Sequence, residues 1–337
     1  ITADGLQGGG EVLIGGDWQG AAGTPTAHQT LIQPKAYISA SAQQQGNGGT
    51  VVAWAENTSQ IYGQLVAHGG VQGGHGGRVE TSAKQWLSVQ GVPDVSAPAG
   101  RAGSWLIDPT DITISATASS GINQTTSGST DSFVPLSPAP SSAILNAADL
   151  ITAINAGHSV TVNTTSSGGG TGDITITSPL AFAPSSNSGQ LNLTADHDIT
   201  LQSGAPVSSS GQRIKLGLNA GGQITLQDNI NTAGGDISLQ GQQLALNSAI
   251  TASGANLILK NTGSGGITAS GAITAQTLEL NSANGSSVTF SNPANQITQL
   301  HGTVGGAFAL KNAGNLVIDN NNFNNISSTD GSIKIES

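Results

Sequence analysis

The sequence predicts an all-β fold, a parallel β-helix whose coils contain about twenty residues each. From residue 173 onward, short segments recur with apolar residues at every second position, which is typical of strands that have one buried face. Equivalent segments follow at a near-constant interval: Ile224 to Leu244 and Ile237 to Leu257 span 20 residues, and Leu257 to Leu278 spans 21. Gly, Asn, Ser and Asp fill the intervals, as tight turns between stacked coils require.

The composition differs from that of an ordinary globular enzyme. Of the 337 residues, 48 are glycine, while 8% are charged and 3% are aromatic. The recurring pairs of Ile, Leu and Val nevertheless predict an ordered chain rather than a disordered one. The sequence contains no cysteine and no methionine, which excludes disulfide bonds, thiolate catalysis and cysteine-ligated zinc.

The charge balance argues against a nucleic-acid partner. The formal net charge is −10, and the nine Lys and Arg residues are scattered singly rather than gathered into a basic patch. No apolar run approaches the roughly 18 residues that a spanning helix needs, so we expect no membrane insertion. The chain opens without the basic and apolar regions of a signal peptide, so we expect a mature product or an excised piece.

Three regions are expected along the chain. Residues 1–115 predict a Gly-rich β-helix segment with longer turns, and all four tryptophans lie within it. Residues 116–143 are rich in Ser, Thr and Pro and lack alternation, which predicts a loop or linker. Residues 144–337 predict the remaining β-helix repeats, beginning with a short helix.

The short helix is expected near residues 146–156. Four apolar side chains can share one helical face, namely Leu145, Leu150, Ile151 and Ile154. Asn146 or Ser142 is a candidate N-cap, and Gly157 is a candidate stop. Such a helix would cover apolar surface at an end or side of the solenoid.

Several motifs in one order resemble the large exoproteins related to filamentous haemagglutinin, which are secreted by the two-partner pathway. They are GLQGGGEVLIGGDWQG (5–20), GGTVVAWAE (48–56), HGGRVETSAKQWLSV (75–89), WLIDPTDITI (105–114) and the segment that begins LNAADLITAINAGHSVTV (145–162). The resemblance implies a right-handed parallel β-helix in a secreted or cell-surface adhesin. It also implies export through an outer-membrane transporter, and an interior piece of a longer protein.

The stretch WLIDP is expected to be the point where one solenoid segment ends. Trp105 and Leu106 are expected to cover the exposed end of the stack. Pro109, after Asp108, is expected to interrupt strand pairing before Ile112 begins a new strand. Their expected role is structural.

Candidate ligand contacts are aromatic side chains with amides or carboxylates beside them. Sugar rings stack on aromatic faces, and their hydroxyls need planar polar partners. Trp18 with Asp17, Tyr62 beside Gln60 and Gln64, and Trp86 beside Gln85 match this chemistry. The alternation around Trp86 is equally compatible with a place inside the coil.

Catalytic and metal-binding patterns are weak. Asp196, His197 and Asp198 stand together, but between two apolar pairs where a polar turn is expected. The calcium repeats of β-rolls are iterated and separate the glycine from the aspartate. Here Asp173 directly follows Gly172, and the surrounding segment is not repeated. His68 and His75 flank Gly-rich turns and could meet on adjacent coils. We therefore assign no catalytic residue, no metal and no cofactor.

The leading hypothesis is a non-enzymatic structural and binding segment of a secreted adhesin that mediates cell-cell, biofilm-matrix or host attachment. The expected partners are exopolysaccharide or a host-surface glycan or protein, with the two-partner transporter acting during export of the parent protein. We expect a monomer. The alternatives are a carbohydrate-binding module within the adhesin, and a polysaccharide lyase or hydrolase that uses Asp196 or Asp198.

Overall fold

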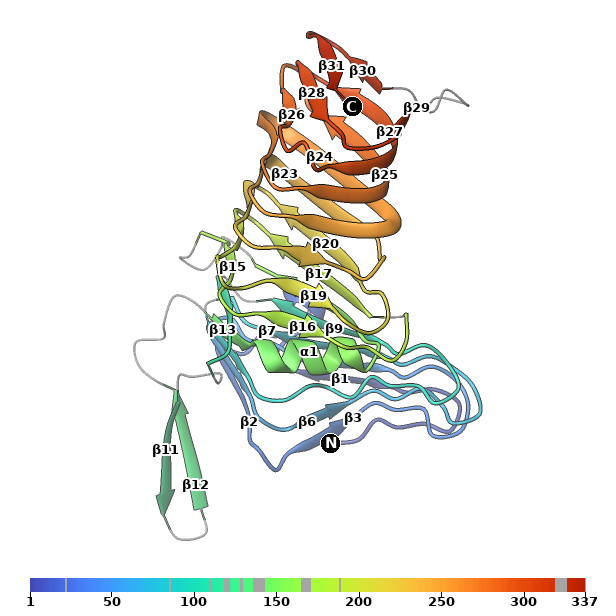
Figure 1. The fold of residues 1–337 in the computed structure, drawn as a ribbon. Helices are drawn as coiled ribbons and strands as arrows, with labels where there is room; N and C mark the ends of the chain where they lie inside the picture. Colours follow the sequence, from blue (N-terminus) through green and yellow to red (C-terminus); the bar gives the residue numbers. More distant parts are fainter. Residues whose placement is uncertain are drawn as a thin grey trace. The chain divides into compact units, whose positions relative to one another are not determined.

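A computed structural model gives the fold and divides the chain into two compact units, Ile1–Asp173 and Ile174–Ser337. The structure describes residues 1–21, 23–84, 86–108, 111–117, 122–127, 130–135, 143–164, 171–187, 189–318 and 326–336. Both units consist mainly of parallel strands stacked coil on coil, which confirms the all-β parallel β-helix (Figure 1). Each unit is described by itself below.

The second unit consists of short strands joined by tight turns. The strands are β15 (Ile174–Ile176), β16 (Leu180–Phe182), β17 (Gln190–Ala195), β18 (Ile199–Leu201), β19 (Val207–Ser209), β20 (Lys215–Ala220), β21 (Gln223–Leu226), β22 (Ile230–Asn231), β23 (Ile237–Leu246), β24 (Ile250–Ala269), β25 (Ile273–Ser282), β26 (Val288–Phe290), β27 (Gln296–Val304), β28 (Phe308–Lys311), β29 (Val317–Ile318), β30 (Ile326–Ser328) and β31 (Ile333–Glu336). Its early coils form three parallel ladders, begun by β15–β18, β16–β19 and β17–β20.

The register of these ladders confirms the twenty-residue period. The strand partners include Ile224 with Leu244, Ile237 with Leu257, and Leu257 with Leu278. The first coils of this unit are longer, because Ile174 pairs with Ile199, 25 positions later. Longer turns between the same three strands accommodate the additional residues.

Alternation within each strand builds the core. In β23, the side chains of Ile237 and Leu239 are fully buried, whereas Ser238 faces solvent. Parallel pairing in register places apolar side chains directly above one another from coil to coil. Near the C-terminal coils the rings of Phe290 and Phe308 meet edge to face, with their centroids 6.2 Å apart.

The first unit has larger coils, which also form three parallel ladders. Its elements are β1 (Glu11–Ile14), η1 (Trp18–Gly20), β2 (Gln29–Ile32), β3 (Tyr37–Ser39), β4 (Thr50–Ala53), β5 (Thr58–Ile61), β6 (Gln64–Val66), β7 (Arg78–Ser82), β8 (Trp86–Val89), β9 (Ser104–Asp108), β10 (Ile112–Ser115), β13 (Ala143–Asn146), α1 (Ala147–Asn155) and β14 (Ser159–Asn163). Parallel ladders join β1, β4, β7, β9 and β14, then β2, β5 and β8, then β3 and β6. Val51 pairs with Val79, 28 positions later.

A column of glycines holds the long turns of the first unit together. A Cβ atom at Gly103 would overlap the carbonyl oxygen of Gly77, and one at Gly77 would overlap that of Gly49. The same carbonyls accept hydrogen bonds from the chain of the next coil, at 3.0 Å from Ser104 and 2.9 Å from Arg78. Glycine therefore precedes successive strands because no side chain fits between these turns.

The helix α1 confirms the predicted helix with Asn146 as its N-cap, whereas Leu145, expected on the helical face, lies in β13. The side-chain oxygen of Asn146 accepts a hydrogen bond from the Ala148 N–H at 2.8 Å, and Gly157 ends the helix with φ +83°. Leu150 and Ile154 are fully buried, whereas Ile151 is half-buried. Among the described residues, no helix has the length and apolar character that crossing a membrane requires.

The helix belongs to the first unit rather than to the second. The boundary between the units falls after Asp173, not near residue 143 as expected. The reason is strand pairing, because β13 pairs with β10 and β14 pairs with β9, so the chain returns to the first stack before and after the helix.

The region expected to be a loop, residues 116–143, contains regular pairing in its described part. β11 (Ile122–Ser127) and β12 (Thr130–Pro135) form an antiparallel pair of their own. Residues 118–121, 128–129 and 136–142 lie outside the described residues. An antiparallel pair needs only a short connection, in contrast to the parallel coils around it.

The register of β23 predicts how two neighbouring substitutions change the free energy of unfolding. Ile237→Ala is expected to lower the free energy of unfolding by about 2–4 kcal/mol, because it leaves a cavity in the fully buried column. Ser238→Ala, on the exposed face one position along, is expected to change it by less than about 0.5 kcal/mol. Urea denaturation followed by far-ultraviolet circular dichroism measures both variants. Equal losses would contradict this register.

Candidate functional site

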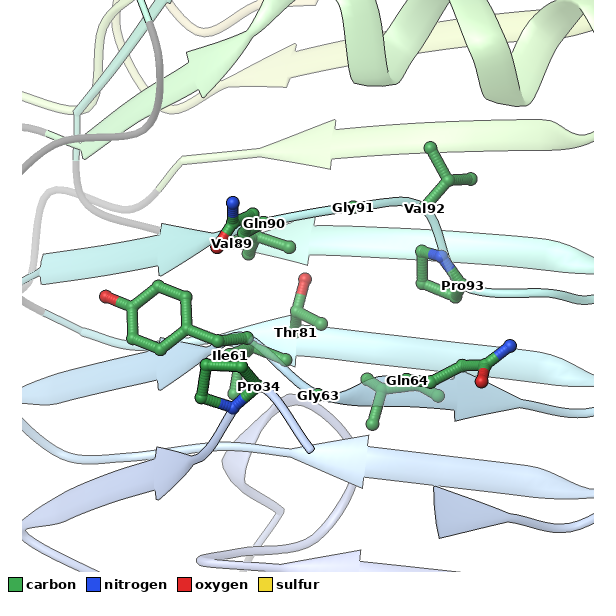
Figure 2. A pocket seen from close by; sticks show the side chains of 12 residues that line it. Pro34, Ile61, Gly63, Gln64, Thr81, Val89, Gln90, Gly91, Val92 and Pro93 are labelled. Atoms are coloured by element: carbon green, nitrogen blue, oxygen red, sulfur yellow. The ribbon is translucent and has the colours of Figure 1, made fainter. Parts of the chain in front are cut away.

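A pocket of about 210 Å³ opens on the first unit where the chain turns after β5 and after β8. It is lined by residues from the corners of three successive coils and from β7. The lining residues are Pro34, Ile61, Tyr62, Gly63, Gln64, Leu65, Thr81, Val89, Gln90, Gly91, Val92 and Pro93. We name it the corner pocket, and Figure 2 shows it from close by.

The corner pocket combines apolar walls with polar groups. Ile61 and Val89 are buried strand ends of neighbouring coils, and they are paired in register. The buried Thr81 hydroxyl oxygen accepts a hydrogen bond from Trp105 Nε1 at 3.0 Å. In Figure 2 the amide groups of Gln64 and Gln90 lie at opposite ends of the view, and both side chains are exposed.

Tyr62 lies in this pocket but is not an exposed platform. The residue is 7% exposed, and its hydroxyl donates to the Ser88 hydroxyl oxygen at 3.2 Å. Burial raises the pKa of Tyr62, against the opposing effect of its hydrogen bonds with Ser88 and Gln60. Of the predicted amide neighbours, Gln64 lines the pocket, whereas Gln60 is buried.

The edge of the corner pocket lies against α1. The Asp149 carboxylate in the first turn of the helix accepts the backbone N–H of Gly91, and burial raises the pKa of that carboxyl. Asp149 was not predicted as a residue of the site. Acidic residues are common in the first turn of a helix, so the sequence offered no reason to place this one against another coil.

Two histidines, His68 and His158, lie near the Asp94 carboxylate. His68 Nε2 lies 2.7 Å from Asp94 Oδ2, and the Ser96 N–H donates to Asp94 Oδ1 at 3.1 Å. Burial raises the pKa of Asp94, but the hydrogen bonds from His68 and Ser96 and the His68 charge outweigh it, so the net pKa is lowered. His75 does not contribute here, because its ring nitrogen accepts the Arg101 N–H at 3.1 Å.

His158, directly after α1, completes this group. The residue is 4% exposed, and its Nδ1 has no hydrogen-bond partner among the described residues. Burial lowers the pKa of His158, and the negative charge of Asp94 opposes that shift. A buried imidazole therefore lies just after the helix, within the electrostatic influence of the Asp94 carboxylate.

The turn at Trp18 is built as a structural cap. Asp17 Oδ1 accepts the Trp18 N–H at 2.7 Å, and Asp17 Oδ2 accepts the Thr24 hydroxyl at 3.3 Å. The Arg78 guanidinium lies 4.4 Å from the centroid of the half-buried Trp18 ring. The expected pair is thus adjacent, but the Asp17 carboxylate already accepts two hydrogen bonds of the turn.

Glu80 stabilises this turn, and its role was not predicted from the sequence. It is fully buried on β7, and its Oε2 accepts the Gln19 N–H at 2.8 Å. Gln19 has φ +53°, a left-handed conformation that is uncommon for a residue with a side chain. The two residues are 61 positions apart, and no local pattern in the sequence connects them.

The buried tryptophans correct two expectations. Trp86 is 1% exposed, so its ring is not available for a sugar to stack on. Trp105 is fully buried, but it lies inside the stack rather than at an end, because β9 pairs with β7 on one side and β14 on the other. Asp108 pairs through its backbone with Ser82, and Pro109 lies outside the described residues.

The described aspartates of the second unit lie in turns between strands. The segment Asp196–Asp198 forms the expected turn between β17 and β18, and Asp198 Oδ1 accepts the Gln223 N–H at 2.6 Å. Asp228 Oδ2 likewise accepts the Gly204 N–H of the preceding coil at 2.7 Å. Similar bonds run from Ala249 N to Asn229, from Asn256 N to Asp236 and from Ile273 N to Asn295.

No protein-family model matches this chain, and no curated protein matches it as a relative.

Asp228 provides a test of the bonds between coils. Asp228→Ala removes the acceptors of two backbone N–H groups, those of Gly204 and Asn229, and is expected to cost about 1–2 kcal/mol of unfolding free energy. Asp228→Asn keeps a side-chain oxygen and is expected to lose less. Urea denaturation followed by circular dichroism measures both. An unchanged midpoint for Asp228→Ala would show that the carboxylate does not link the coils.

His158 makes the first unit sensitive to pH. The pKa of His158 is lowered in the folded state. Below about pH 6.5 the unfolded chain therefore binds the proton more readily than the folded chain, and the free energy of unfolding decreases as the pH decreases. The slope is expected to reach at most about 1.4 kcal/mol per pH unit and to disappear above about pH 6.5.

Tryptophan fluorescence reports on this unit, because all four tryptophans lie in it. Urea unfolding at several pH values between about 5 and 8 compares the wild type with His158→Gln, which does not titrate in this range. Subtracting one slope from the other removes the contributions of Asp94 and Asp149 to the pH dependence of the free energy of unfolding, because both proteins contain these residues. Identical slopes would contradict the assignment to His158.

Proposed function

We propose that this chain is a non-enzymatic structural and binding segment of a secreted bacterial surface adhesin. Its coils would extend the parent protein and carry surfaces that attach to exopolysaccharide or to a host-surface glycan or protein. The motif order from GLQGGGEVLIGGDWQG to LNAADLITAINAGHSVTV supports this family, and with it export through an outer-membrane two-partner transporter.

One observation carries the structural part of the proposal. In the second unit, turn carboxylates and amides accept backbone N–H groups of a neighbouring coil, as Asp228 does from Gly204 and Asn229 from Ala249. These bonds add to the parallel ladders, so each coil is held to its neighbours at both strands and turns. A segment built this way is suited to transmit tension and to hold a surface in a fixed orientation.

The corner pocket favours a second candidate, a carbohydrate-binding module within the same adhesin. Its lining joins exposed amides to apolar walls, the combination with which proteins bind sugars. This candidate differs from the first in assigning the attachment to one defined pocket of this chain rather than to surfaces along its coils.

Attachment under flow tests the proposal. Beads coated with the purified chain are expected to be retained, in a saturable manner, on surfaces of bacterial exopolysaccharide or host-cell glycoprotein, without release of sugar products. Beads coated with the heat-unfolded chain are the control and are expected to wash off. Retention with product release would instead indicate a polysaccharide-active enzyme, and no retention on any surface would contradict the binding role.

A further inference from the structure

The size of the corner pocket limits what it can hold. Its volume of about 210 Å³ is below the roughly 300–1,000 Å³ of pockets for drug-sized ligands. The pocket lies at an outer corner of the coils, and Gln64 and Gln90 at its rim are exposed. The space therefore suits one small ring, with the rest of a longer ligand lying outside.

The lining supplies complementary groups for a ring with hydroxyls. Each of Gln64 and Gln90 offers one acceptor oxygen and two donor hydrogens in a plane, which can pair with neighbouring hydroxyls. The exposed Pro34 adds apolar surface on which the C–H face of a ring can pack.

The charge around the pocket selects against anions. None of the twelve lining residues carries a positive or negative charge at neutral pH. A carboxylate, that of Asp149, binds the N–H of Gly91 at the pocket edge. A sialic acid or uronic acid would bring a second carboxylate toward Asp149 without a cation in the lining to compensate.

We propose that the corner pocket binds one neutral hexose ring of a glycan. This inference deepens the carbohydrate-binding candidate above and rests on it. The ring would pack against Pro34 while Gln64 and Gln90 pair with its hydroxyls. The glycan chain would continue outward past the exposed amides.

Gly91 offers a way to block the pocket without removing a core side chain. It has φ +87°, and a Cβ atom added there would meet no heavy atom within 4 Å. Asparagine tolerates this left-handed conformation better than other residues with side chains. Gly91→Asn therefore places a side chain in open space at the pocket lining and keeps the backbone N–H that Asp149 accepts.

Gly204 is a matched control in the second unit. It also has φ +87°, its added Cβ would also meet no heavy atom within 4 Å, and its N–H is also accepted by a carboxylate, that of Asp228. Gly204→Asn thus imposes the same backbone strain away from the corner pocket. Gln90→Ala is a second pocket variant that leaves the backbone unchanged.

The experiment measures binding of the full chain to arrayed oligosaccharides ending in glucose, galactose or mannose, and to sialylated and uronate-containing ones. The wild type and Gly204→Asn are expected to bind a neutral glycan alike, with Gly91→Asn and Gln90→Ala weaker by about ten-fold or more. Acidic glycans are expected to bind at least about ten-fold less tightly than neutral ones.

Three results would overturn the proposal. Undiminished binding by both Gly91→Asn and Gln90→Ala would place glycan recognition elsewhere on the chain, and the binding role of the adhesin segment would stand. Equal binding of acidic glycans would reject the neutral-ring selectivity. If the wild type binds no neutral glycan, the pocket assignment fails, while bead retention on protein-bearing host surfaces separately decides the proposed function.

Discussion

The register between parallel coils is the constraint on which both units depend. Once Ile237 is paired with Leu257, and Leu257 with Leu278, every intervening side chain is assigned to the core or to the surface. A slip of one residue would move Ser238 inward and Ile237 outward, exchanging the two faces of the strand. The buried columns, the turn carboxylates and the surface polar groups all follow from this pairing.

The two units maintain that register by different means. In the second unit, turns are short, and acceptors such as Asp228 and Asn229 bind the backbone of adjacent coils. In the first unit, the turns are long, and glycines such as Gly77 and Gly103 let them lie directly against one another. The longer coils leave corners at which side chains from several coils meet, and the corner pocket lies at one of them.

Local features were predictable from the sequence, and distant contacts were not. The twenty-residue period and the Asn146 cap each depend on residues close in the chain or on a repeat, so periodicity and capping chemistry predicted them. The contact of Gln19 with Glu80 and the pair of His68 with Asp94 depend on how coils of unequal length stack. Alternation alone likewise could not separate the half-buried Trp18 from the buried Trp86, because every residue of β8 is buried whereas Trp18 lies in the short turn η1.

Disulfide trapping tests the register most directly, since the chain has no cysteine of its own. Thr268 and Thr289 are partners on exposed positions of neighbouring parallel strands, where Cα atoms lie about 4.8 Å apart, within reach of a disulfide. The variant with cysteine at both positions is expected to lose its free thiols on mild oxidation. A variant with cysteines at Thr268 and the exposed Ser287, two positions out of register and roughly 8 Å away, is expected to keep them. Preferential bridging of the second pair would contradict the register and the coil assignment built on it.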